Sequence, residues 1–89
     1  MLQLQEVEKI KVKILGPGCK NCKKLEQEMI NALAELGVAA DVEKISDMDK
    51  IMEHDIMMTP GLVINEKVKV FGRVPRKEEI KKWIREEIN

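Results

Sequence analysis

The sequence has few aromatic residues, a single pair of cysteines and no long apolar run. Phe71 and Trp83 are the only Phe, Tyr or Trp residues among the 89, so the chain lacks a set of rings on which bases could stack. Its 16 basic and 16 acidic side chains cancel, which argues against the basic face of a nucleic-acid-binding protein. No apolar run approaches the roughly 18 residues that a membrane-spanning helix needs. We therefore expect neither nucleic acid nor a membrane as partner.

The length suits one small domain, and 44% hydrophobic residues are enough to form its core. Residues 1–8 carry neither the basic region nor the apolar region of a secretory signal, so we expect a cytoplasmic protein. From Leu2 to Glu8 apolar and polar residues alternate, which is typical of an edge strand or a loose extension. The expected division is therefore an N-terminal extension or edge strand over 1–8 and one domain over 9–89.

The two cysteines, Cys19 and Cys22, form one C-x-x-C motif. A disulfide that closes so short a loop constrains the unfolded chain little, so stability is a poor explanation for the pair. Redox chemistry and metal binding remain. A structural zinc ion needs four ligands, whereas one chain offers these two thiols and at most His54. We expect no metal ion and no organic cofactor.

The first half of the chain alternates between strand and helix patterns. Residues 9–15 alternate lysine with branched apolar side chains, which predicts a strand. The glycines and proline of residues 16–18 end it, and a helix is expected from the first cysteine to a stop at Gly37. The expected apolar face of this helix consists of Cys22, Leu25, Met29, Leu33 and Leu36.

The second half predicts a strand near 38–45, a short helix from Ser46, a hairpin over 62–71 that turns at residues 65–66, and a last helix whose first turn holds Pro75. The inward residues are expected to be Met48, Ile51 and Met52 in the short helix and Ile80, Trp83, Ile84 and Ile88 in the last one. The order β-α-β-α-β-β-α predicts an α/β fold with a mixed four-stranded sheet and flanking helices.

The C-x-x-C motif lies where the first strand ends and the first helix begins. Free backbone N–H groups and the helix dipole favour an anion at a helix start, so the pKa of the Cys19 thiol is expected below its usual range. The charge of Lys20 is expected to lower it further. Cys22, one turn later, faces inward but can reach the first sulfur. Cys19 is thus the expected nucleophile and Cys22 the residue that resolves the mixed disulfide.

The segment Gly-Pro-Gly-Cys-Lys-Asn-Cys over 16–22, the Thr59-Pro60 pair before the hairpin and Gly72 at its end resemble the thioredoxin-like superfamily, in particular its small glutaredoxin-sized redox-active members. The resemblance implies a thioredoxin-like fold and a thiol–disulfide oxidoreductase that acts on protein disulfides. It implies a cis Thr59–Pro60 bond opposite the cysteines, which leaves the Thr59 backbone unpaired and ready to bind a substrate strand. Gly18 and Pro60 are the further substrate-binding residues that we expect, together with Met58 as part of an apolar rim; the alternative for Met57 and Met58 is a packed loop. A thioredoxin-reductase-like protein is the expected electron donor, and a monomer the expected state.

The chain also departs from this family pattern. Lys20 and Asn21 separate the cysteines where many thioredoxins have Gly-Pro, and Lys13 stands where thioredoxins hold a buried acid. We expect Lys13 to favour a cysteine thiolate; the alternative is that it extends its charged end to solvent. Two other functions remain open. One is a metal-binding C-x-x-C module, either copper-chaperone-like or a zinc-bridged dimer, and the other is a non-catalytic binding module on the same fold.

Overall fold

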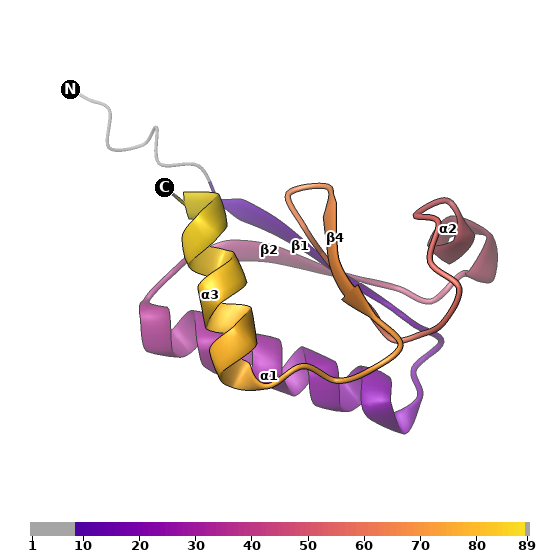
Figure 1. The fold of residues 1–89 in the computed structure, drawn as a ribbon, viewed down its shortest axis with the longest axis horizontal. Coiled ribbons are helices and arrows are strands. Elements are labelled where there is room, and N and C mark those ends of the chain that lie inside the picture. The colour runs from indigo at the N-terminus through magenta and orange to yellow at the C-terminus, as the bar shows by residue number, and fades with distance from the viewer. Residues whose placement is uncertain (1–8, 89) are drawn as a thin grey trace.

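The computed structural model describes residues 9–88, which form the expected order of elements, β-α-β-α-β-β-α (Figure 1). The elements are β1 (Ile10–Leu15), α1 (Lys20–Leu36), β2 (Ala40–Ile45), α2 (Met48–Met52), β3 (Gly61–Ile64), β4 (Lys67–Phe71) and α3 (Lys77–Ile88). The edge strand or extension expected over 1–8 lies outside the described residues.

The strands form one mixed four-stranded sheet in the order β2-β1-β3-β4. β1 pairs parallel with β2 and antiparallel with β3, and β3 and β4 form the expected antiparallel hairpin. The hairpin turns at Asn65 and Glu66, whose φ angles of 51° and 67° are those of a type I′ turn. β1 therefore lies inside the sheet, and its carboxyl end leads directly to the cysteines.

One face of the sheet packs against α1 and α3, which cross on the same side (Figure 1). The alternation in β1 turns Ile10, Val12 and Ile14 toward these helices. The helices contribute Leu25, Met29, Ala32, Ile80 and Ile84, each fully shielded from solvent. Trp83 is partly buried against this core, while Ile88, expected to be inward, is 48% exposed near the chain end.

Among residues 9–88, α2 and the loop after it are the only segments that cover the opposite face, at the end near the cysteines. Ile51 and Ile56 pack there on Leu15, Ile45 and Val63. The expectation that Met48 and Met52 also point inward is wrong, because they are 52% and 62% exposed. α2 is only five residues long and presents one position to the sheet. Its N-cap is Asp47 rather than Ser46, with Oδ1 accepting from the Asp49 N–H at 2.9 Å.

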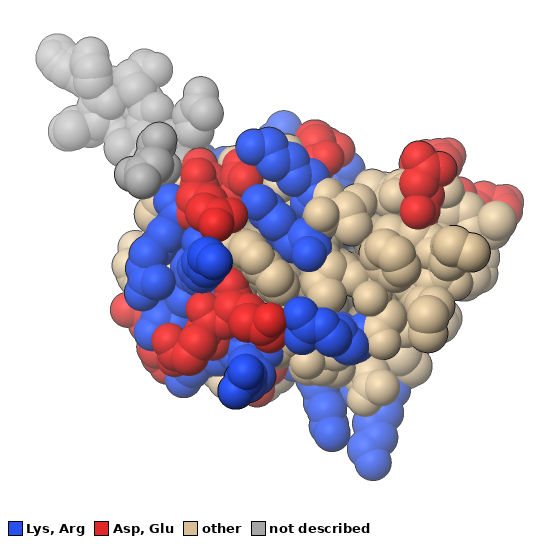
Figure 2. Space-filling view, in the orientation of Figure 1, with Lys and Arg blue, Asp and Glu red and all other residues tan. Residues whose placement is uncertain are grey.

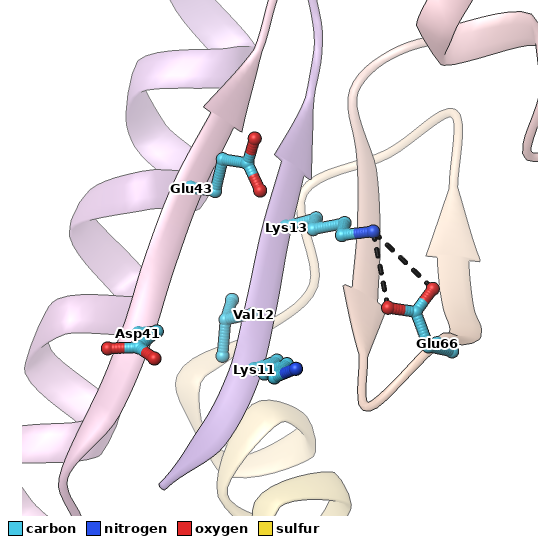
Figure 3. Close-up of a pocket in the computed structure, with 6 residues that line it drawn as sticks. All are labelled: Lys11, Val12, Lys13, Asp41, Glu43 and Glu66. Atoms are coloured by element: carbon cyan, nitrogen blue, oxygen red, sulfur yellow. Dashed lines mark hydrogen bonds and ion pairs between the residues drawn. The ribbon is translucent and has the colours of Figure 1, made fainter.

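Away from α2, the same face is open and bears charged side chains. A hollow of about 340 Å³ lies there between β1, β2 and the hairpin turn (Figure 3). This explains why a strand inside the sheet carries lysines at alternate positions. The residues around the hollow are Lys11, Val12, Lys13, Asp41, Glu43 and Glu66.

β2 forms one outer edge of the sheet, and only Ile45 of its six residues is buried. Its Asp41 and Glu43 line the hollow, while Lys44 pairs with Glu26 of α1 at 3.5 Å on the other face. The edge strand thus carries charge on both faces.

Candidate functional site

Cys19 and Cys22 form a disulfide at the start of α1, with their Cα atoms 5.0 Å apart. Cys19 is the N-cap residue of the helix. Its backbone is extended, with φ −70° and ψ 171°, and its Sγ accepts a hydrogen bond from the Cys22 N–H at 3.2 Å. The Cys19 sulfur therefore occupies the position that an oxygen acceptor usually takes at a helix start.

The two cysteines differ in exposure, as the helix periodicity predicts. Cys19 is exposed, whereas Cys22 is 5% exposed and belongs to the inward face of α1 with Leu25 and Met29. A sulfur that is open to solvent and accepts a backbone N–H can meet an external disulfide. A buried sulfur bonded to it can meet only that first sulfur. The geometry suits a two-step exchange of disulfides.

Gly16, the residue after β1, lies directly against Cys22. A Cβ added to Gly16 would overlap Cys22 Sγ, and it would lie 3.3 Å from Cys22 Cβ and 3.9 Å from Pro60 Cα. The Gly16 N–H donates to the Ile45 carbonyl at 2.9 Å, which holds this backbone in place at the ends of β1 and β2. Sequence reasoning treated residue 16 as a strand terminator and as part of the family motif, and it missed this contact, because the contact depends on how three segments meet.

The loop before β3 also borders Gly16. The Thr59–Pro60 peptide bond is cis, and Pro60 is buried. The Pro60 carbonyl accepts from the Gly72 N–H at 2.8 Å, which joins the loop to the end of β4. Within residues 9–88, the Thr59 backbone N–H and C=O form no hydrogen bond with another backbone group. Thr59 itself is half-buried.

Met57 and Met58 extend this loop into solvent, where they are 88% and 59% exposed. A Cβ at Gly72 would lie 3.4 Å from Met58, so Met58 also borders the end of the hairpin. Gly18, with φ +93°, and Lys20 are exposed on the two sides of Cys19 in the chain. The structure thus brings together the cysteines, Gly18, Lys20 and the 58–60 loop.

Lys13 is the predicted site residue that lies elsewhere. Its Nζ is 3.2 Å from Glu66 Oε2 in the hairpin turn, and its side chain points across the open sheet face (Figure 3). The Glu66 carboxylate neutralises the ammonium group there. This placement gives no support to the expected action of Lys13 on a thiolate.

A salt bridge that sequence reasoning missed secures the loop after β4. Arg73 donates from both terminal nitrogens to Glu79, at 3.1 Å and 3.0 Å, and the Arg76 N–H donates to Glu79 Oε1 at 2.9 Å. These hydrogen bonds, that of Arg73 first, lower the pKa of Glu79 to about 2. The Glu three residues after Arg76 is the sequence signal that could have indicated this cap.

Within residues 9–88, no three or more His, Cys, Asp or Glu side chains gather closely enough to hold a metal ion. In the same part of the chain, no helix has both the length and the apolar character to cross a membrane.

Residues 9–85 match the thioredoxin domain family. The chain belongs to the thioredoxin family. It is 47% identical to a thioredoxin of Methanothermobacter thermautotrophicus over 73 residues, which cover 82% of this chain and 95% of that protein. It is 31% identical over 74 residues to a thioredoxin of Methanocaldococcus jannaschii, covering 83% of this chain and 85% of the relative.

Solved thioredoxin structures show the same fold at much lower identity. Thioredoxin-2, described as a component of the protein secretion machinery of the malaria parasite, superposes with a TM-score of 0.63 at 15% identity over 88% of this chain and 82% of that one. Oxidised thioredoxin from Plasmodium falciparum gives 0.60 at 10% identity, covering 92% and 84%. The expected thioredoxin-like fold is confirmed. With its C-x-x-C pair joined as a disulfide, this family member is a thiol–disulfide oxidoreductase.

Proposed function

We propose that the chain exchanges disulfides with proteins, with Cys19 as nucleophile and Cys22 as resolving cysteine. The observation that carries this assignment is the difference between an exposed cysteine whose sulfur caps α1 and a buried cysteine bonded to it. In the reduced protein, the Cys22 N–H and the helix start favour Cys19 as a thiolate. Lys20 adds positive charge beside it.

The reaction has two balanced steps. The Cys19 thiolate attacks one sulfur of a substrate disulfide; that bond breaks, a mixed disulfide forms, and the other substrate sulfur leaves as a thiolate and takes up a proton. The Cys22 thiolate then attacks Cys19 Sγ, which forms the Cys19–Cys22 disulfide and releases the second substrate thiol. The substrate gains two electrons and the cysteine pair loses two. A thioredoxin-reductase-like dithiol donor returns them.

The substrate chain binds across the 58–60 loop. Among residues 9–88 the N–H and C=O of Thr59 have no backbone partner, so both can pair with an extended segment, as in strand addition. Pro60 and Gly18 border the cysteines, and Met58 supplies an adaptable apolar contact. Lys13 has no part in this proposal, because Glu66 holds its ammonium group. We further propose that the protein acts as a monomer in the cytoplasm.

The roles of the two cysteines are tested by trapping. Reduced protein is treated with a limiting amount of iodoacetamide, and alkylation is mapped by mass spectrometry. We expect Cys19 to react about tenfold faster than Cys22 or more, since Cys19 is exposed and Cys22 is buried. Cys22→Ser should accumulate a mixed disulfide with a disulfide-containing protein such as insulin, and Cys19→Ser, the matched control, should not.

Faster labelling of Cys22, or trapping by Cys19→Ser alone, would reverse the two roles. Failure of the wild-type protein to reduce insulin with dithiothreitol as donor would instead favour a non-catalytic binding module. Zinc that stays bound at one ion per two chains after mild chelation would favour the zinc-bridged dimer.

A further inference from the structure

At the end of the molecule that carries the cysteines, the acidic and the basic side chains lie on different helices. Figure 2 shows a broad uncharged surface there, with acidic side chains at the top over α2 and basic side chains at the bottom below α1. The acidic residues of α2 and its flanks are Asp47, Asp49, Glu53 and Asp55, all exposed. The basic residues at the beginning of α1 are Lys20, Lys23 and Lys24, also exposed. Lys50 is the one cation within the acidic group.

The three lysines of α1 lie where their charge opposes the helix dipole. The first turn of α1 contains no acidic residue, and cations near a helix N-terminus oppose the helix dipole. Lys23 and Lys24 follow Lys20 by three and four positions, where like charges on one face repel. Within residues 9–88 none of the three forms a salt bridge, whereas Lys77 and Lys81 of α3 both pair with Glu35 of α1. An external anion would relieve this unfavourable arrangement.

The uncharged surface between the two charged borders carries exposed apolar side chains. Met57 and Met58 are the most exposed large hydrophobic residues of its loop, at 88% and 59%, and Phe71 at the end of β4 is 42% exposed. An apolar centre with a charged rim is the usual build of a protein-binding surface. The rim supplies orientation and specificity more than affinity.

We propose that this protein recognises disulfide-bearing protein segments of polarised charge. The acidic side chains of such a segment face Lys20, Lys23 and Lys24, and its basic side chains face the carboxylates of α2. The cysteine lies between them, over the apolar surface. The inference rests on the proposed exchange with protein disulfides and adds to it the charge pattern of the substrate.

Two peptides of equal composition test this pattern. Each has one cysteine and is used as its disulfide-linked homodimer; one carries two Glu before the cysteine and two Lys after it, and the other has the reverse order. The rate constant for reduction of each peptide disulfide by the reduced wild-type protein is divided by the rate constant for its reduction by dithiothreitol. This normalisation removes differences in the intrinsic reactivity of the two disulfides. Exposed ion pairs change a rate by up to about fivefold each, so we expect the two normalised rates to differ about two- to tenfold at low salt. The difference should disappear near 1 M salt, where the Debye length is about 3 Å.

Charge reversal shows which residues read the pattern. In the double variant Lys23→Glu/Lys24→Glu, the ratio of the two normalised rates should fall to about one, or the preferred peptide should change. A change in the reactivity of Cys19 affects both rates equally and therefore cancels in the ratio. Lys82→Glu alters an exposed lysine of α3 that forms no salt bridge within residues 9–88, and it should leave the ratio unchanged.

Equal normalised rates for the two peptides with the wild-type protein would overturn the proposal. A ratio that is the same in the Lys23→Glu/Lys24→Glu variant as in wild type would also overturn it. An uncharged peptide disulfide of the same length separates this result from the proposed function. If the uncharged peptide reacts but the charged pair is not distinguished, only the recognition proposal fails. If the uncharged peptide does not react either, the exchange with peptide disulfides itself is refuted.

Discussion

Replacing Gly16 by alanine should make the cysteine pair easier to reduce. The added methyl group would overlap Cys22 Sγ and press on Cys22 Cβ at 3.3 Å. In the oxidised protein this sulfur is bonded to Cys19, which is itself held as the cap of α1, so the side chain cannot turn away. In the reduced protein Cys22 is free to change its rotamer. The steric penalty therefore falls mainly on the oxidised form.

The size of the effect follows from the cost of overpacking. Forcing an extra methyl group into a packed site costs about 1 to 3 kcal/mol. For a two-electron couple, 1.4 kcal/mol corresponds to about 30 mV. If most of the penalty falls on the disulfide, Gly16→Ala should raise the reduction potential by roughly 20 to 60 mV relative to wild type. The unfolding free energy should drop by about 1 to 3 kcal/mol in the oxidised protein and by less in the reduced one.

The assay is a redox titration of both proteins in glutathione buffers, with urea unfolding of each redox form. Gly37→Ala is the matched control, because Gly37 has φ 65° at the end of α1 and no neighbour within 4 Å of an added Cβ. It should lower stability by about 1 kcal/mol in both redox forms without moving the potential. A Gly16→Ala protein with the wild-type potential and equal losses in both forms would refute this reasoning.

Three further substitutions test other parts of the structure. Lys13→Met should leave the thiolate absorbance titration near 240 nm superimposed on that of wild type, because Glu66 pairs with the ammonium group; a shifted curve would restore its expected effect on the cysteines. Glu79, whose pKa is lowered to about 2 by Arg73 above all, stabilises the fold fully above pH 4.5 and progressively less as pH falls toward 2. The stability difference between wild type and Glu79→Gln should therefore shrink over that range in acid unfolding curves, and a constant difference would contradict this. Ile84→Ala should cost about 2 to 5 kcal/mol in urea unfolding of either redox form, because the side chain is fully buried; a loss below 1 kcal/mol would show that the core repacks there.

Much of the fold could be predicted because its signals are local. The alternation in β1 and the interval of three and four in α1 each follow from one element facing one core. Gly37 ends α1 in the left-handed conformation that a glycine stop predicts. The same reasoning placed Cys19 outside and Cys22 inside, because both lie on that one helix.

Features that depend on several segments meeting were beyond sequence reasoning. Met48 and Met52 follow a helical pattern, but the sheet offers α2 room for Ile51 alone. The contact of Gly16 with Cys22 needs the end of β1, the start of α1 and Pro60 in one place. Lys13 gave no sign of its partner, since Glu66 is 53 residues away and becomes a neighbour only through the pairing of β1 with β3. The cis form of Thr59–Pro60 was inferred from family resemblance rather than from the residues themselves.

The charges of β2 have a consequence for how this protein meets other chains. Two copies that joined their β2 edges antiparallel would be related by a two-fold axis perpendicular to the sheet, which keeps each side chain on its original face. With Val42 at the axis, Asp41 of each copy would stand opposite Glu43 of the other; with Glu43 at the axis, the two Glu43 residues would meet. Either register crowds four carboxylates onto one face, and like charges directly opposite are destabilising. This edge therefore resists pairing with a second copy, whereas the proposed substrate strand would pair with the Thr59 backbone, which forms no hydrogen bond with another backbone group within residues 9–88.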